Sequence, residues 1–148
     1  MSDTATTLAA TKAIDRQLDD LIHAASLNVA KLQGSGMKEN QIRNVVNVAG
    51  ASVSIEEVTN FIRYQIGRRD TGRIWAHEDF GKSVIADIES GAVKSALESV
   101  IQAVPNADRI SVRSRLIALY LGYLNRCFIY ADKTGDWKNL SSLPEGRG

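Results

Sequence analysis

The sequence is poor in cysteine and in long apolar runs. Its single cysteine, Cys127, leaves no partner for a disulfide within the chain, which favours a reducing, cytoplasmic compartment. Residues 1–7 are polar and lack the basic start and apolar core of a secretory signal peptide. The longest apolar run, residues 116–124, has about half the length that a bilayer-spanning helix requires. We therefore expect a cytoplasmic protein that makes no membrane contact.

Residues that could carry chemistry are also scarce. A metal site needs several converging ligands, and the best candidates lie far apart in the sequence: His23, His77 and Cys127. No serine or cysteine is accompanied by the base and orienting group that nucleophilic catalysis requires. The glycines follow no predicted strand and are not spaced as a phosphate-binding loop. We therefore expect no enzymatic activity, no metal and no cofactor, and we interpret Cys127 as a buried thiol.

Helical periodicity is the main signal that the sequence contains. Apolar residues make up 44% of the 148 residues and charged residues 24%, as in an ordinary globular protein of one-domain size. Strand signals are almost absent, so the expected fold class is all-α. We expect one domain over residues 1–148, with loose ends at 1–7 and 140–148. Apolar residues at three- and four-residue steps predict a compact bundle of five to six helices, over residues 8–33, 38–49, 54–69, 78–90, 92–104 and 108–134.

Several helix boundaries have their own signals. Ser54 followed by Glu57 is the pattern of a capping box, in which the serine accepts an amide bond and the glutamate reaches back. Asp108 can cap the last helix, and residues 34–36 (Gly-Ser-Gly) are expected to end the first. Residues 70–76 are expected to form a loop. Because the last helix is apolar nearly all round between Leu116 and Leu124, we expect it at the centre of the bundle.

A cluster of arginines on the third predicted helix is the clearest functional signal. Arg63 and Gly67 share one helical face, as do Tyr64 and Arg68, while the apolar residues of this segment point inward. The exposed side therefore offers guanidinium groups, which bind phosphate, beside an aromatic ring that can stack on a base. The basic side chains of this segment are Arg63, Arg68, Arg69 and Arg73, and Lys38 and Arg43 on the preceding helix would extend the same patch.

The charged residues also allow an alternative interpretation. The same arginines could form an ordinary solvated face, with Arg63 and Arg68 paired to Glu56, Glu57 or Asp70. A second basic cluster at the start of the last helix has the same alternative, namely Arg109, Arg113 and Arg115. Between the two clusters lies an acidic stretch, residues 78–98.

The order of parts resembles the small subunit of type III CRISPR effector complexes. The resemblance covers residues 38–135 and rests on three segments. Residues 39–44 (Glu-Asn-Gln-Ile-Arg-Asn) are similar to a helix start in that family, and residues 61–68 are similar to its segment with a tyrosine followed by Gly-Arg. The third segment is the apolar helix over residues 116–135, which ends in Tyr-Ala-Asp-Lys-Thr-Gly.

This resemblance implies a non-catalytic subunit of an RNA-guided antiviral defence complex. Members of the family are compact helical bundles that line up inside the complex and bridge its other subunits. They contact the backbone of the guide RNA and target RNA mainly through phosphates, without reading sequence. Residue matching assigns the RNA-facing role to Arg43, Arg63, Arg68 and Arg69, with Lys38 and Arg73 as weaker candidates.

Two alternatives come from other functional classes. The first is a protein-only adaptor or oligomerisation module, in which the acidic stretch of one copy docks on the basic cluster of the next and gives head-to-tail self-association. The second is a helix-turn-helix DNA-binding regulator that uses residues 54–69 as its recognition helix. Such a regulator should discriminate among duplex sequences, whereas a phosphate-binding subunit should not.

Overall fold

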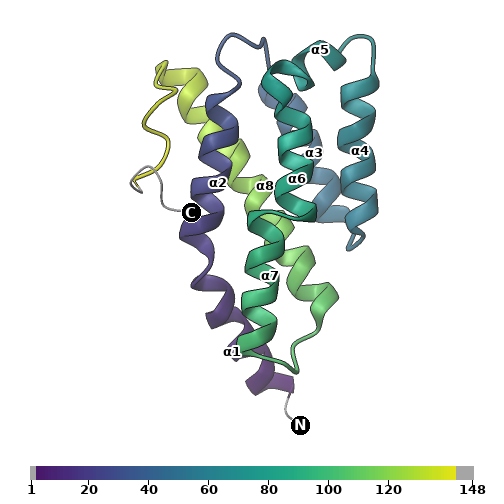
Figure 1. The fold of residues 1–148 in the computed structure, drawn as a ribbon, viewed down its shortest axis with the longest axis vertical. Coiled ribbons are helices and arrows are strands. Elements are labelled where there is room, and N and C mark those ends of the chain that lie inside the picture. Colours follow the sequence, from purple (N-terminus) through teal and green to yellow (C-terminus); the bar gives the residue numbers. More distant parts are fainter. Residues whose placement is uncertain (1–2, 143–148) are drawn as a thin grey trace.

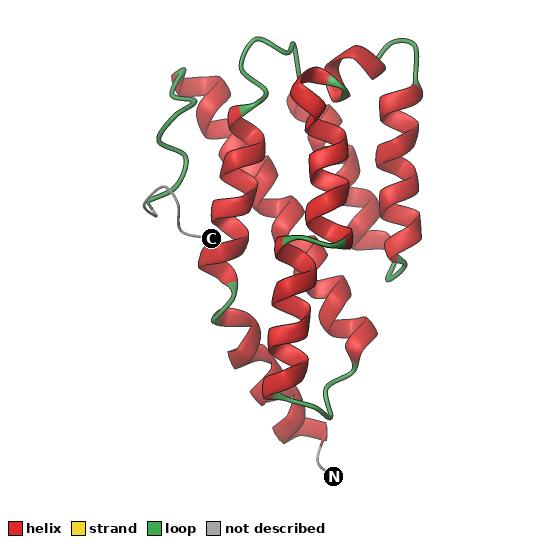
Figure 2. Cartoon of the chain, in the orientation of Figure 1, coloured by secondary structure: helices red, strands yellow, loops and turns green. Residues whose placement is uncertain are grey.

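The computed structural model describes residues 3–142, and every regular element in that part of the chain is helical (Figure 2). This confirms the all-α class. The outermost residues of the expected loose ends, 1–2 and 143–148, lie outside the described residues. The elements are α1 (Asp3–Asp15), α2 (Leu18–Ala30), α3 (Glu39–Ala51), α4 (Ile55–Gly67), α5 (Gly72–Trp75), the 3-10 turn η1 (His77–Asp79), α6 (Phe80–Glu89), α7 (Ala92–Ala103) and α8 (Arg109–Thr134).

The helices share one continuous apolar core. Helix α8 makes its most extensive contacts with α2, α3 and α7 and also touches α1. No residue of α8 between Leu116 and Leu124 is exposed. Helix α4 lies at one edge of the molecule, where it packs against α3, α5 and α6 (Figure 1). Its remaining face is therefore open to solvent.

The first predicted helix is two helices in the structure. The regular pattern breaks after α1, where the Gln17 N–H donates to the carbonyl of Ile14, three residues back, at 2.8 Å. The break lets α1 pack against α7 and α8 while α2 packs against α6, α7 and α8. Helix α2 then ends at Ala30, and Gly34 and Gly36 take positive φ angles of 78° and 81° in the turn that follows.

The predicted loop over residues 70–76 is also wrong, because it contains α5. Trp75 is only 2% exposed and stacks obliquely on Phe80, with ring centroids 5.4 Å apart. Burying this indole requires the chain to coil back onto the core. The following helix starts at Phe80 rather than at residue 78, because Glu78 and Asp79 have positive φ angles of 48° and 59°. The two extra elements and the divided first helix raise the number of helices above the expected five to six.

The two cap predictions are confirmed in their main part. The Ser54 hydroxyl accepts a hydrogen bond of 3.1 Å from the Glu57 N–H, and an Asp108 carboxylate oxygen accepts one of 3.2 Å from the Ser111 N–H. The reciprocal half of the capping box is wrong, since the Ser54 N–H donates to the hydroxyl of Ser52 at 3.0 Å. Helix α4 therefore starts where its sequence signal places it.

Two glycines at the ends of the α4–α5 turn give a matched stability test. A Cβ atom at Gly72 would fall 2.5 Å from the Ile66 carbonyl oxygen, whereas one at Gly67 would meet no heavy atom within 4 Å. Gly72→Ala should lower the free energy of unfolding by about 1–3 kcal/mol, because the backbone must shift. Gly67→Ala should raise it by up to about 1 kcal/mol, because alanine favours the helix.

Chemical denaturation of the two variants beside the parent chain measures both effects. Equal stability of the two variants would contradict the close approach of α5 to the end of α4.

Candidate nucleic-acid interface

The turn between α4 and α5 is fixed to the core at both ends. The Thr71 hydroxyl donates a hydrogen bond of 2.8 Å to the Gln65 carbonyl, and both residues are buried. The Gly72 N–H donates to the Arg68 carbonyl at 2.7 Å. Residues 69 and 70, between these anchors, are exposed. The turn therefore presents charged side chains from a backbone with little freedom to move.

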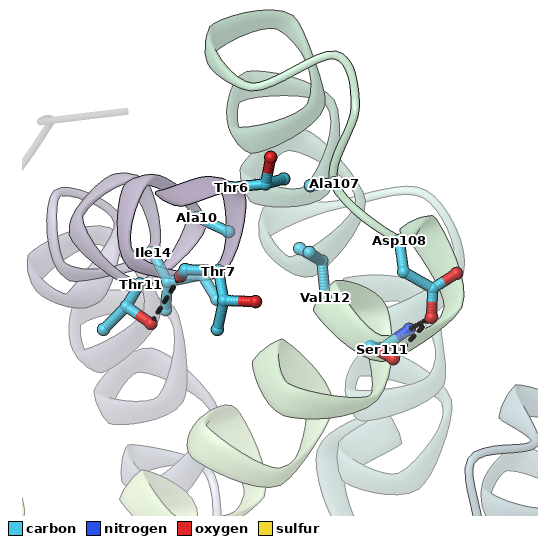
Figure 3. Close-up of a pocket in the computed structure, with 9 residues that line it drawn as sticks. All are labelled: Thr6, Thr7, Ala10, Thr11, Ile14, Ala107, Asp108, Ser111 and Val112. Atoms are coloured by element: carbon cyan, nitrogen blue, oxygen red, sulfur yellow. Dashed lines mark hydrogen bonds between the residues drawn. The ribbon is translucent and has the colours of Figure 1, made fainter. Parts of the chain in front are cut away.

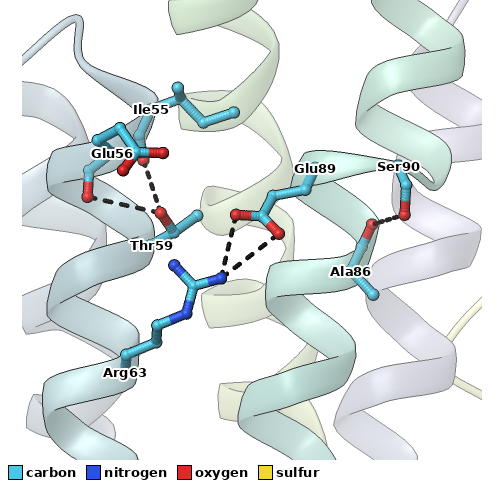
Figure 4. Close-up of polar contacts among 7 residues, drawn as sticks. All are labelled: Ile55, Glu56, Thr59, Arg63, Ala86, Glu89 and Ser90. Atoms are coloured by element: carbon cyan, nitrogen blue, oxygen red, sulfur yellow. Dashed lines mark hydrogen bonds and ion pairs between the residues drawn. The ribbon is translucent and has the colours of Figure 1, made fainter.

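Three of the six predicted RNA-binding side chains are paired with carboxylates of the same chain. Arg43 pairs with Glu39 one turn away on α3, at 2.5 Å. Arg68 pairs with Asp70 at 2.9 Å, as the solvated-face alternative predicts. Arg63 reaches across to α6, where its Nη2 donates to the carboxylate of Glu89 at 3.2 Å (Figure 4).

The pairing of Arg63 corrects the sequence interpretation. The solvated-face alternative named Glu56, Glu57 or Asp70 as partners, but the partner of Arg63 lies on a neighbouring helix, 26 residues further along the chain. Both side chains of this pair are largely exposed, at 53% for Arg63 and 38% for Glu89. An ion pair so accessible to water contributes at most about 1 kcal/mol and is readily exchanged.

The positive charge of the other three predicted RNA-binding side chains is not balanced by a carboxylate of the described chain. Lys38, Arg69 and Arg73 are exposed, and none forms an ion pair within residues 3–142. Because α3 and α4 run in opposite directions, the start of α3 and the end of α4 lie at one end of the molecule, beside α5 (Figure 1). The structure thus places these three residues at the same end.

A fourth cation at this end escaped the sequence interpretation. Lys82 is exposed in the first turn of α6, which follows α5 and η1. It was missed because it lies within the acidic stretch. We call Lys38, Arg69, Arg73 and Lys82 the basic end. It is not uniformly positive, since Glu78 and Asp79 lie in η1 between α5 and α6.

One of the three arginines of the second basic cluster is neutralised within the chain. Arg109 donates to both carboxylate oxygens of Glu98, at 3.0 and 2.7 Å. Hydrogen bonds from Arg109 and Lys94 lower the pKa of the Glu98 carboxyl to about 2. Arg113 is half-buried and Arg115 is exposed, and neither forms an ion pair in the described chain. With Arg115 as its one exposed and unpaired member in the described chain, this cluster offers an anionic ligand less free charge than the basic end does.

A buried polar cluster links α2, α6 and α8 and was not foreseen from the sequence. One Asp87 carboxylate oxygen accepts hydrogen bonds from the Tyr120 hydroxyl at 2.5 Å and from the Asn28 amide at 2.8 Å. Asn28 also donates to the Tyr120 hydroxyl at 3.0 Å. Burial raises the pKa of the Asp87 carboxyl above its usual 3.8, although these donors act in the opposite direction. The cluster ties three helices together below the surface.

Two of the grooves on the described part of the chain lie away from the basic end. One, of about 330 Å³, lies between α1 and the start of α8 and is lined mainly by threonines and small apolar residues (Figure 3). The other, of about 400 Å³, lies between α2 and α7, next to the exposed Leu27. Neither contains an arginine or lysine, so neither extends the basic end.

No group of three or more metal-ligating side chains comes together among residues 3–142. Within the same residues, no helix combines the length and apolar character of a bilayer-spanning segment. Neither a protein-family model, nor a curated protein, nor a solved structure matches this chain. The functional interpretation therefore rests on the residues and their geometry.

The buried cluster predicts a pH-dependent stability effect. The raised folded-state pKa of Asp87 means that stability from this group is present at low pH and is lost as pH rises through that pKa. Tyr120→Phe removes a donor to the ionised carboxylate and should lower the free energy of unfolding by about 1–2 kcal/mol at neutral pH. The loss should shrink in acid, where Asp87 is protonated.

Denaturation curves over a pH series measure this effect, with Tyr123→Phe on the same helix as control. Tyr123 is half-buried, and its hydroxyl has no hydrogen-bond partner within residues 3–142. A pH-independent loss for Tyr120→Phe would contradict the role given to Asp87.

Proposed function

We propose that this chain is a non-catalytic RNA-binding subunit that contacts the phosphate backbone through the basic end. Following the resemblance described above, we propose that it is the small subunit of a type III CRISPR effector complex. In that role it packs along the guide RNA and target RNA in the cytoplasm and bridges the other subunits.

One observation supports the RNA-binding proposal. Basic side chains that form no ion pair in the described chain lie together at and beside the α4–α5 turn. Arg69 precedes α5 and Arg73 lies within it, and both are exposed without an ion pair in the described chain. A phosphate can accept their hydrogen bonds without first displacing a carboxylate. Contacts of this kind fix the position of the RNA backbone on the protein but carry no information on the RNA sequence.

The contributions of the six predicted residues are therefore unequal. We propose that Arg69 and Arg73 make the main contacts, supported by Lys38 and by the added Lys82. Arg43, Arg63 and Arg68 reach RNA only by exchanging Glu39, Glu89 and Asp70 for phosphate. Because these pairs are exposed, that exchange costs little, but each retained carboxylate reduces the attraction for an anion.

Binding of a labelled RNA by the purified chain, measured over a salt series, tests this proposal. Replacing Arg69 and Arg73 together by alanine should lower affinity about equally for unrelated RNA sequences. It should also reduce the slope of log K against log salt concentration by about 2, one unit for each lost phosphate contact.

The matched control replaces Lys12 and Arg115 by alanine. These residues are also exposed and free of ion pairs in the described chain, but they lie on α1 and at the start of α8. Equal loss of affinity in both double variants, or no RNA binding by the parent chain, would overturn the proposal.

Purification of the tagged chain from its native host tests the proposed assembly. We expect a large multi-subunit complex containing short RNAs that share a repeat-derived end. Recovery of the chain alone, or of protein partners without RNA, would contradict it and would favour the protein-only adaptor.

The adaptor remains the second candidate because of one feature, the exposed Leu27 beside the groove between α2 and α7. The proposed docking of the acidic stretch of one copy on the basic cluster of the next has weaker support in the structure. Within the acidic stretch, Glu89 and Glu98 are already paired with arginines and Asp87 is largely buried. Head-to-tail self-association through that stretch would have to break these contacts. A salt-sensitive oligomer without RNA affinity would support the adaptor.

A further inference from the structure

An exposed aromatic ring lies on α4, five residues before Arg69 of the basic end. The side chain of Tyr64 is 57% exposed. Phe61 packs beside it, with ring centroids 6.4 Å apart, and the Arg68 guanidinium carbon lies 5.3 Å from the centroid of the Tyr64 ring. Asp70 in turn holds Arg68. Two planar groups are therefore fixed next to each other at the surface, and we call them the Tyr64–Arg68 pair.

The surface beside this pair is unobstructed. Gly67 lies three residues after Tyr64, hence on the neighbouring part of the same helical face. It is exposed, and a Cβ atom built on it would meet no heavy atom within 4 Å. A flat ligand can therefore approach the backbone of α4 alongside the tyrosine ring.

We propose that the Tyr64–Arg68 pair binds the base of one unpaired RNA nucleotide, while the basic end holds the adjoining phosphates. This inference rests on the proposed function and specifies its ligand. Bases in the interior of a duplex are stacked on both sides and present no face to a protein surface, so along a duplex only an unpaired base can stack on Tyr64. Every base has such a face, and the pair therefore selects unpaired nucleotides without selecting their identity.

Three related RNAs separate base stacking from phosphate binding. The first is a short blunt duplex, and the second is the same duplex with one unpaired adenosine in the middle. The third carries an abasic ribose in place of that adenosine, so it keeps the bulged backbone and its charge but lacks the base. Fluorescence anisotropy of each labelled RNA with the purified chain gives the dissociation constants.

The parent chain should bind the adenosine bulge about tenfold more tightly than the duplex or the abasic bulge, as expected for stacking of one base. Tyr64→Leu should abolish this preference, because it removes the ring. Tyr64→Phe should retain it, because it removes only the hydroxyl. Since Tyr64 is mostly exposed, both variants should fold, and circular dichroism checks that they do.

Gly67→Leu supplies an independent test from the neighbouring position. Residue 67 is exposed and a Cβ atom there would meet no heavy atom within 4 Å, so the variant should be at least as stable as the parent. The leucine would nevertheless occupy the approach to the Tyr64 ring. It should remove the preference for the adenosine bulge while leaving affinity for the blunt duplex unchanged.

The outcomes distinguish this inference from the proposed function. Equal binding of all three RNAs by the parent chain, with weaker binding after loss of Arg69 and Arg73, would overturn the stacking site and leave backbone binding intact. A preference for the adenosine bulge that survives Tyr64→Leu would also overturn the stacking site. Failure of the parent chain to bind any of the three RNAs would overturn both.

Discussion

The burial of the middle of α8 is the constraint on which the rest of the fold depends. A helix that is apolar on nearly all sides is stable in water only if other helices cover it. Helices α2, α3 and α7 supply most of that cover, and α1 adds to it. Helix α4 packs instead against α3, α5 and α6 at the edge of the molecule. It needs only one buried face, so its outer face is available for charged and aromatic residues.

The distribution of charge follows from this arrangement. Where two helices lie side by side, arginines meet carboxylates, as Arg63 meets Glu89 between α4 and α6 and Arg109 meets Glu98 between α8 and α7. Where the chain turns at the end of α4, Asp70 pairs with Arg68, and neither Arg69 nor Arg73 pairs with a carboxylate of the described chain. The exposed ring of Tyr64 lies shortly before this turn on α4, in contact with Arg68. The proposed anion binding and aromatic stacking are thus assigned to adjoining segments, the α4–α5 turn and the end of α4.

The sequence predicts the features that depend on local chemistry. The all-α class, the start of α4 at the Ser54 cap and the start of α8 at the Asp108 cap are confirmed, because periodicity and capping act over only a few residues. The helical face shared by Tyr64 and Arg68 was predictable for the same reason, and their ring contact follows from it.

Features that depend on distant contacts were not predictable in this way. The short helix α5 forms because Trp75 must reach the core, and a four-residue element has too little periodicity to read from sequence. The left-handed backbone at Glu78 and the pairing of Arg63 with a residue on α6 are likewise set by how helices pack. The buried cluster of Asn28, Asp87 and Tyr120 joins three helices that nothing in the sequence marks as neighbours.

The central claim is that the α4–α5 turn is where RNA binds. Backbone amide chemical shifts of the isotopically labelled chain, followed by NMR during titration with a short RNA, test it most directly. The account predicts that the perturbed amides lie from Tyr64 to Arg73 and near Lys38 and Lys82, with α7 unaffected. Perturbations confined to the groove between α2 and α7, or the absence of any RNA-dependent change, would contradict it.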